Sequence, residues 1–138
     1  MPRQLDRSSP ISISTYEVIR GLTDPELTEQ YYFGSRIRSD WQVGDTYSYR
    51  NPDDSILLDG SIVALEPGTR IVMTFRPVWA YGDQPPVSEV VYELEAASPS
   101  VTQLTLTHRG LPAEDPVSDG IRAGWVQILT GLKTVVEK

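Results

Sequence analysis

The middle of the chain alternates apolar and polar residues with a period of two, and this pattern restricts the fold more than any other feature. Between residues 36 and 110, turn-forming glycine, proline, asparagine and aspartate residues interrupt the alternation about every ten residues. Such a pattern is typical of consecutive antiparallel strands joined by turns. The predicted strands are 35–41, 45–50, 56–65, 70–77, 87–95 and 101–109.

Within these strands, the alternation assigns the apolar residues to one face of the sheet and the polar residues to the other. The predicted apolar face holds Ile71, Met73, Phe75, Val90, Tyr92, Leu94, Leu104, Leu106 and His108. Neighbouring residues such as Thr74, Glu93 and Thr105 are polar and are predicted to face water. A sheet with one apolar face needs a second element to cover it.

The C-terminal segment is the long apolar element that remains for this role, because its apolar residues recur at helical spacing. Asp115 is a suitable N-cap and Pro116 suits the first helical position. The stripe predicted to pack on the sheet consists of Val117, Ile121, Trp125, Ile128, Leu132, Val135 and Val136. We therefore expect a long C-terminal helix against the apolar face of the sheet.

Three glycines weaken this helix, since each lowers helix stability by about 1 kcal/mol relative to alanine. Gly120, Gly124 and Gly131 lie within roughly 40° of one another on a helical wheel, at one edge of the apolar stripe. Two interpretations are open. The missing side chains either permit close packing of the helix, or leave a groove in which a small molecule approaches the backbone.

Two short helices are predicted ahead of the strands. A short extended stretch at 11–14 leads into a helix at about 16–22, and the next helix begins at Pro25 with Thr23 or Asp24 as its N-cap. No repeat or linker interrupts the sequence, so residues 1–138 are predicted to form one domain with one core, with residues 1–10 partly flexible.

Charge and composition argue against several classes of function. The net charge is −7 and no basic face is visible, so neither nucleic acid nor a membrane surface is an expected partner. No apolar run is long enough to span a bilayer, and residues 1–10 lack the apolar stretch of a signal peptide, so we expect a cytoplasmic protein. The absence of cysteine excludes thiolate nucleophiles and cysteine-based zinc sites.

Five motifs, which together cover most of the chain from about residue 11, resemble a known family. They are GLTDPELTEQYYFG at 21–34, SDWQVGDTYSYR at 39–50, DGSIVALEPGTRIVMTFRP at 59–77, VTQLTLTHRGLP at 101–112 and GWVQILTGLKTVVE at 124–137. They resemble the START-like (SRPBCC) superfamily, and within it the homologues of the heat-shock protein 90 ATPase activator. The resemblance implies an α+β helix-grip fold like that of the birch pollen allergen. In that fold a curved antiparallel sheet wraps around a long C-terminal helix, and two short helices follow the first strand.

Most of the candidate site residues are aromatic. They come from several strands, a loop and the last helix, so they can meet only if the sheet curls around that helix. The candidate ligand-binding residues are Trp41, Tyr47, Tyr49, Phe75, Trp79, Tyr92, His108, Gly124, Trp125 and Ile128. Such a set forms either a filled core or an apolar pocket. The cavities known in the resembled superfamily favour the pocket, with its entrance near 31–33 and 78–86.

His108 is the only histidine and therefore the candidate for acid–base chemistry. A single histidine on a strand is more often a structural donor or a polar point in a pocket than a catalyst. No cysteine or second histidine accompanies it, and no nucleophile elbow or phosphate loop is present. We therefore predict no catalytic residue, no metal site and no cofactor.

The leading hypothesis is non-catalytic binding of a small apolar or amphipathic molecule between the sheet and the C-terminal helix. Trp125 and the other large rings would contact its apolar part, while His108 and Tyr47 would orient a polar group. A second hypothesis, implied by the resembled family, is a protein-interaction module that modulates a chaperone ATPase or another macromolecule. A third is a cyclase or hydrolase in which His108 reaches a bound substrate.

Overall fold

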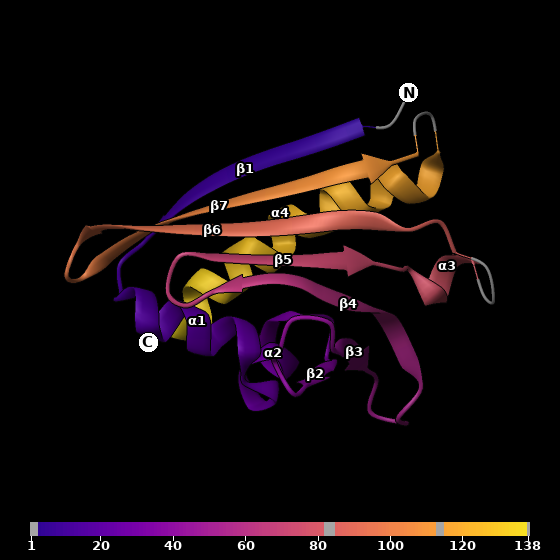
Figure 1. Cartoon of the computed structure of the whole chain (residues 1–138), viewed down its shortest axis with the longest axis horizontal. Coiled ribbons are helices and arrows are strands. Elements are labelled where there is room, and N and C mark those ends of the chain that lie inside the picture. Colours follow the sequence, from indigo (N-terminus) through magenta and orange to yellow (C-terminus); the bar gives the residue numbers. More distant parts are fainter. Residues whose placement is uncertain (1–2, 82–84, 113–114, 138) are drawn as a thin grey trace.

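A computed structural model describes residues 3–81, 85–112 and 115–137, and Figure 1 shows the whole chain. The elements are β1 (Arg3–Ile11), α1 (Thr15–Thr23), α2 (Pro25–Tyr31), β2 (Arg36–Ser39), β3 (Thr46–Arg50), β4 (Ile56–Glu66), β5 (Arg70–Phe75), α3 (Val78–Tyr81), β6 (Ser88–Ser98), β7 (Val101–Leu111) and α4 (Pro116–Val136). The strands form a seven-stranded antiparallel sheet in the order β1-β7-β6-β5-β4-β3-β2. The predicted α+β helix-grip fold is confirmed.

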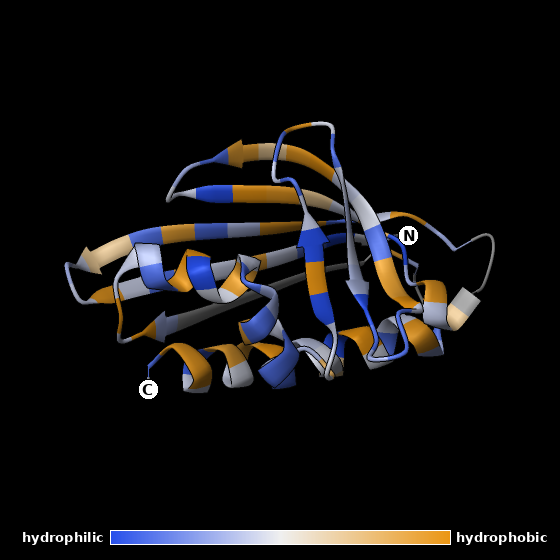
Figure 2. Cartoon of the chain, turned by 90° about the horizontal axis from the view of Figure 1, so that it is seen from below, coloured by the Kyte–Doolittle hydropathy of each residue, from blue (hydrophilic) through white to orange (hydrophobic). Residues whose placement is uncertain are grey.

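The sheet curves around α4, as the resemblance implies. In Figure 1 the helix passes behind the central strands, and in Figure 2 it runs beneath the arch that the strands form. Helix α2 lies beside β2, where its Thr28 bonds the edge strand directly. Its hydroxyl accepts a hydrogen bond from Ile37 N (3.1 Å) and donates one to Ser35 O (3.2 Å). One edge of the sheet is therefore covered by a helix.

The starts of α2 and α4 agree with the predicted caps, and of the two candidates Thr23 and Asp24 it is Asp24 that caps α2. Asp24 accepts a hydrogen bond from Glu26 N (2.9 Å) at the start of α2, and Asp115 accepts one from Val117 N (2.9 Å) at the start of α4. A proline follows each cap, at a position where its missing N–H leaves no bond unmade. Both boundaries were therefore predictable from local chemistry.

The predicted extended stretch at 11–14 is in the wrong place. The first strand runs from Arg3 to Ile11 and pairs with β7, so residues 12–14 form the connection to α1, with Ser14 as its N-cap. The strand was missed because residues 3–10 show no regular alternation, and its backbone pairs with the otherwise unpaired edge of β7. The predicted strand 35–41 is also too long, since Trp41 has a φ of 58°.

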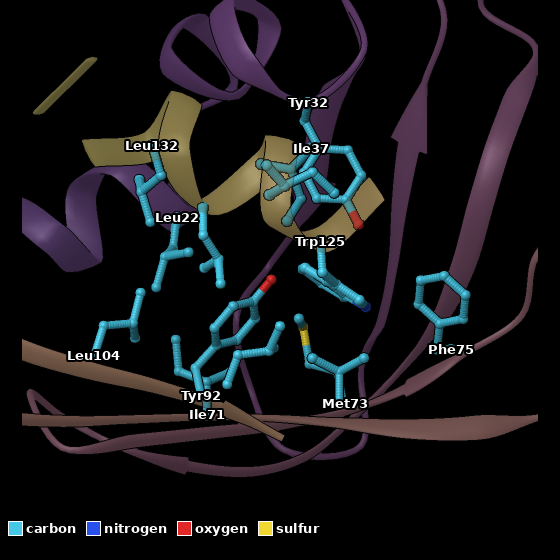
Figure 3. Close-up of a cluster of buried hydrophobic side chains, with 14 of the residues drawn as sticks. Leu22, Tyr32, Ile37, Ile71, Met73, Phe75, Tyr92, Leu104, Trp125 and Leu132 are labelled. Carbon is cyan, nitrogen blue, oxygen red and sulfur yellow. The ribbon is translucent and has the colours of Figure 1, made fainter. Parts of the chain in front are cut away.

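The core lies between the sheet and α4, and the nine residues assigned to the apolar face are all buried. Figure 3 shows Trp125 reaching from α4 toward Met73 and Phe75 of β5. Leu129 is buried too, although the predicted stripe omitted it, because the curved sheet and the small helices cover a wider arc of α4 than a flat sheet would. Val72 and Val91 of the opposite face are also buried, so that face is only partly polar.

The glycines of α4 differ in the space around them. A β-carbon at Gly131 would lie 2.7 Å from the β-carbon of Tyr31, so this glycine lets α2 pack closely on α4. A β-carbon at Gly120 would meet nothing within 4 Å, and one at Gly124 would meet only the ring of Phe33, at 3.5 Å. Gly131 therefore serves packing, whereas Gly120 and Gly124 leave space.

No helix among the described residues is both long enough and apolar enough to cross a bilayer.

Candidate ligand-binding pocket

An apolar cavity of about 350 Å³ lies beside the first half of α4, against β4, β5, α3 and the turn that follows α2. The residues that line it are Tyr32, Phe33, Leu57, Leu58, Phe75, Trp79, Val117, Gly120, Ile121, Gly124, Trp125 and Ile128. None of these lining residues carries a charge, and five of them are aromatic. Such a lining suits a small apolar molecule.

The mouth of this cavity holds two half-exposed rings. Phe33 is 54% exposed and Trp79 is 50% exposed, although both line the cavity. Phe33 belongs to a turn closed by a hydrogen bond from Ser35 N to Tyr32 O (3.0 Å). Exposed rings beside an apolar hollow leave apolar surface in contact with water, which a ligand can cover.

One wall of the cavity depends on an irregularity in β4. Tyr49 pairs with Leu58 while the next residue of β3, Arg50, pairs with Ile56, so Leu57 is an extra residue in its strand. Such a bulge locally breaks the alternation of side chains between the two faces. Leu57 and Leu58, although adjacent, therefore both line the cavity.

Trp125 forms the back of the cavity and joins it to the core. Its side chain is only 2% exposed and lies edge-on to Tyr32 and Tyr92, with ring centroids 6.3 and 6.2 Å away. The indole Nε1–H donates a hydrogen bond to Nδ1 of His108 (2.9 Å). Its polar atom is therefore already engaged and does not face a ligand.

His108 lies behind Trp125 and is fully buried. Because an indole N–H only donates, Nδ1 of His108 must accept, and the proton of the neutral ring is on Nε2. That Nε2–H donates to Oγ of Ser88, 2.7 Å away. Burial lowers the pKa of His108 to about 3, which keeps the ring neutral. In this state His108 cannot accept a proton from Ser88, and it acts as a structural donor and acceptor.

The tyrosines in the cavity wall and behind it are also neutral. Tyr32 stacks on Tyr49 with ring centroids 3.9 Å apart, and burial raises the pKa of both hydroxyls well above the ordinary value. Burial likewise raises the pKa of Tyr92. The surroundings of the cavity therefore carry hydroxyl groups but no tyrosinate charge.

The structure brings together only half of the predicted site. Phe75, Trp79, Gly124, Trp125 and Ile128 line the cavity. Of the other five, Tyr49, Tyr92 and His108 lie in the core behind the cavity. Tyr47 is buried too, and its hydroxyl donates a hydrogen bond to Thr74 O (2.6 Å). Trp41 lies in a separate surface groove with Tyr16 and Ile19. The predicted polar contacts to a ligand are therefore occupied within the protein.

Two of the lining residues absent from the predicted site carried a visible signal in the sequence. Phe33 belongs to the aromatic run 31–33, and Gly120 belongs to the line of glycines on the helix. Leu57 and Ile121 carried no signal that separates a cavity wall from ordinary core. Of the expected entrance segment 78–86, residues 82–84 lie outside the described residues.

Within the described ranges there is no group of three or more histidine, aspartate or glutamate side chains that could hold a metal ion.

Comparison with known proteins identifies both a family and a fold. The family model described as activator of Hsp90 ATPase homolog 1-like protein matches residues 14–137. Protein MLL2253 from Mesorhizobium loti has a similar structure, with a TM-score of 0.81 and 22% identity over 98% of this chain and 97% of that one. A protein called an HSP90 activator from Plasmodium falciparum gives 0.81 and 19%, covering 96% and 95%.

The structure of the Aha1 dimer from Colwellia psychrerythraea is also similar, with a TM-score of 0.79 and 17% identity over 98% of this chain and 96% of that one. At these identities the structural likenesses show a shared fold. No curated protein matches the chain.

Proposed function

The chain belongs to the family of activator of Hsp90 ATPase homolog 1-like proteins, and from that premise we propose that it binds a small, largely apolar molecule in the cavity beside α4 without chemically changing it. The main support for this proposal is the cavity, which has a volume of about 350 Å³ and is lined by uncharged residues. Its volume is at the small end of the range for ligand pockets in proteins.

Gly120 supports this function because it weakens the helix that holds the fold together without serving its packing. Alanine would fit at Gly120, where no atom lies within 4 Å, and would favour the helix by about 1 kcal/mol. Glycine at this position leaves the border of the cavity without a side chain, at the expense of helix stability. A role in packing explains Gly131 but does not explain Gly120.

In this proposal His108 is not a catalytic residue. Both ring nitrogens are bonded inside the protein, and Trp125 stands between the ring and the cavity. A polar group of an amphipathic ligand would remain at the mouth, because the wall behind it supplies no charge.

Filling the cavity should weaken binding while the fold persists. We expect Gly120→Leu to weaken binding of the neutral fluorescent probe N-phenyl-1-naphthylamine at least about tenfold, because Gly120 borders the cavity and no atom lies within 4 Å of a β-carbon there to keep the new side chain out. The matched control is Ala123→Leu, on the exposed face of the same helix. Fluorescence titration measures both. Equal affinity in the two variants would contradict the proposed site.

A second candidate function, modulation of a chaperone ATPase, is favoured by the description of the family. The half-exposed Phe33 and Trp79 would then contact a protein rather than a small molecule. We expect this function to appear as a change in the rate of ATP hydrolysis by the Hsp90 protein of the same organism, and Trp79→Ala should reduce that change. An unaltered rate at saturating concentration would exclude it.

A further inference from the structure

The turn at the mouth of the cavity holds Phe33 in a conformation that phenylalanine rarely adopts. Its φ is 53° and that of Gly34 is 74°, so both central residues of the turn 32–35 have positive φ. Positive φ at both central positions is the pattern of a type I′ turn, which favours asparagine or aspartate followed by glycine. A bulky aromatic residue at the first of these positions makes the backbone less stable.

Neighbouring hydrogen bonds fix this turn firmly. Ser35 donates to Tyr32 O through its backbone N (3.0 Å) and through its hydroxyl (2.6 Å), and Thr28 donates to Ser35 O (3.2 Å). Burial does not compensate for the strain at Phe33, because its side chain remains half exposed. The turn therefore holds this ring at the cavity mouth, although packing there stabilises the protein only slightly.

Phe33 is surrounded by the α4 backbone at Gly124 and by other aromatic rings. The edge of its ring would lie 3.5 Å from a β-carbon at Gly124, so the ring rests beside α4 at a position without a side chain. Two edge-on ring pairs, Tyr32–Phe33 at 6.0 Å and Phe75–Trp79 at 6.3 Å, stand around the cavity. Aromatic rings pack favourably against one another edge to face or with offset stacking. An aromatic ligand can make such contacts with these rings, whereas a saturated ligand cannot.

None of the described residues that line the cavity is charged. The indole N–H of Trp125 already donates a hydrogen bond to His108. A carboxylate inside the cavity would lose its hydration without gaining a partner. A hydroxyl group at the mouth would keep contact with water. The cavity therefore disfavours fatty-acid anions and other charged ligands.

We propose that the ligand of this cavity is an uncharged, flat aromatic molecule, and that Phe33 selects it by packing against its ring. This inference rests on the proposed function, since it requires that the cavity takes an apolar ligand. It adds the chemical class of that ligand and the residue that sets the preference.

Three compounds with one carbon skeleton test the class. Calorimetric titration should show 2-naphthylmethanol binding at least about tenfold more tightly than 2-naphthoate, which adds a charge. It should bind about threefold to tenfold more tightly than decahydro-2-naphthylmethanol, which is saturated and not flat. Equal binding of the three compounds, or tighter binding of either of the other two, would overturn the proposed class.

Phe33→Leu tests the selecting residue. It should keep the binding of the saturated alcohol within about twofold and remove most of the preference for the aromatic one. Tyr16→Leu is the matched control, since Tyr16 is an exposed aromatic residue in a separate groove. An unchanged preference in Phe33→Leu would overturn the role of Phe33.

The proposed function fails in a different way. If neither the alcohols nor N-phenyl-1-naphthylamine binds, the cavity does not take apolar ligands at all. If all of them bind with equal affinity and Gly120→Leu blocks each one, the site is correct and only the aromatic class is wrong.

Discussion

Replacement of Trp125 by alanine is expected to lower the free energy of unfolding by about 3–5 kcal/mol. Trp125 lines the cavity, but its side chain is 2% exposed and packs with Tyr32, Phe75 and Tyr92, so most of its surface is buried in the core. The truncation also removes the donor that His108 Nδ1 accepts from, which leaves a buried acceptor unpaired. Figure 3 shows this side chain among its neighbours.

Trp125→Phe separates the two contributions, because it keeps a ring while removing the N–H group. We expect it to lower the free energy of unfolding by about 1–3 kcal/mol, clearly less than alanine does. Urea denaturation of both variants measures the difference. If Trp125→Ala lowered stability by less than about 1 kcal/mol, this residue would belong to the cavity wall alone and not to the core.

Acid should destabilise the protein through His108. The pKa of its imidazole is about 3 in the folded protein, because of burial, and about 6.5 in the unfolded chain. Between these values the unfolded chain binds a proton that the folded protein does not bind. Stability therefore falls as the pH decreases from 6.5 toward 3, by about 1.4 kcal/mol for each pH unit.

His108→Gln isolates this effect from the titration of carboxylates, since glutamine carries both a donor and an acceptor but does not titrate. The variant should be less stable than the natural protein at pH 7, and the difference should shrink by about 1.4 kcal/mol per unit as the pH falls from 6 to 4. Chemical denaturation at several pH values measures it. Parallel curves would show that His108 is accessible to protons in the folded state.

The strand and helix predictions were reliable where side chains alone decide the structure. Ile71, Met73 and Phe75 alternate with residues of the other face, and a sheet with its core on one side must bury one such set. Asp115 and Pro116 mark the start of α4 by local hydrogen bonding and ring geometry. β1 was missed because it forms by backbone pairing with β7, which leaves no periodic signal.

The site was less predictable because alternation assigns a side chain to a face but not to a depth. Tyr92 and Trp125 both point inward, yet only Trp125 borders the cavity. Leu57 reaches the cavity through a bulge, and Phe33 reaches it through a turn with positive φ. Neither feature follows from hydrophobic periodicity, since both depend on how strands and helices meet in three dimensions.

The central claim is that the cavity beside α4 holds an apolar molecule, and the most direct test is to observe one there. Nuclear Overhauser effects should be measured between bound 2-naphthylmethanol and the methyl groups of the protein. We predict contacts to Leu57, Ile121 and Ile128, which come from two sides of the cavity. Contacts confined to residues outside the cavity, such as Ile19 or Leu65, would contradict the account.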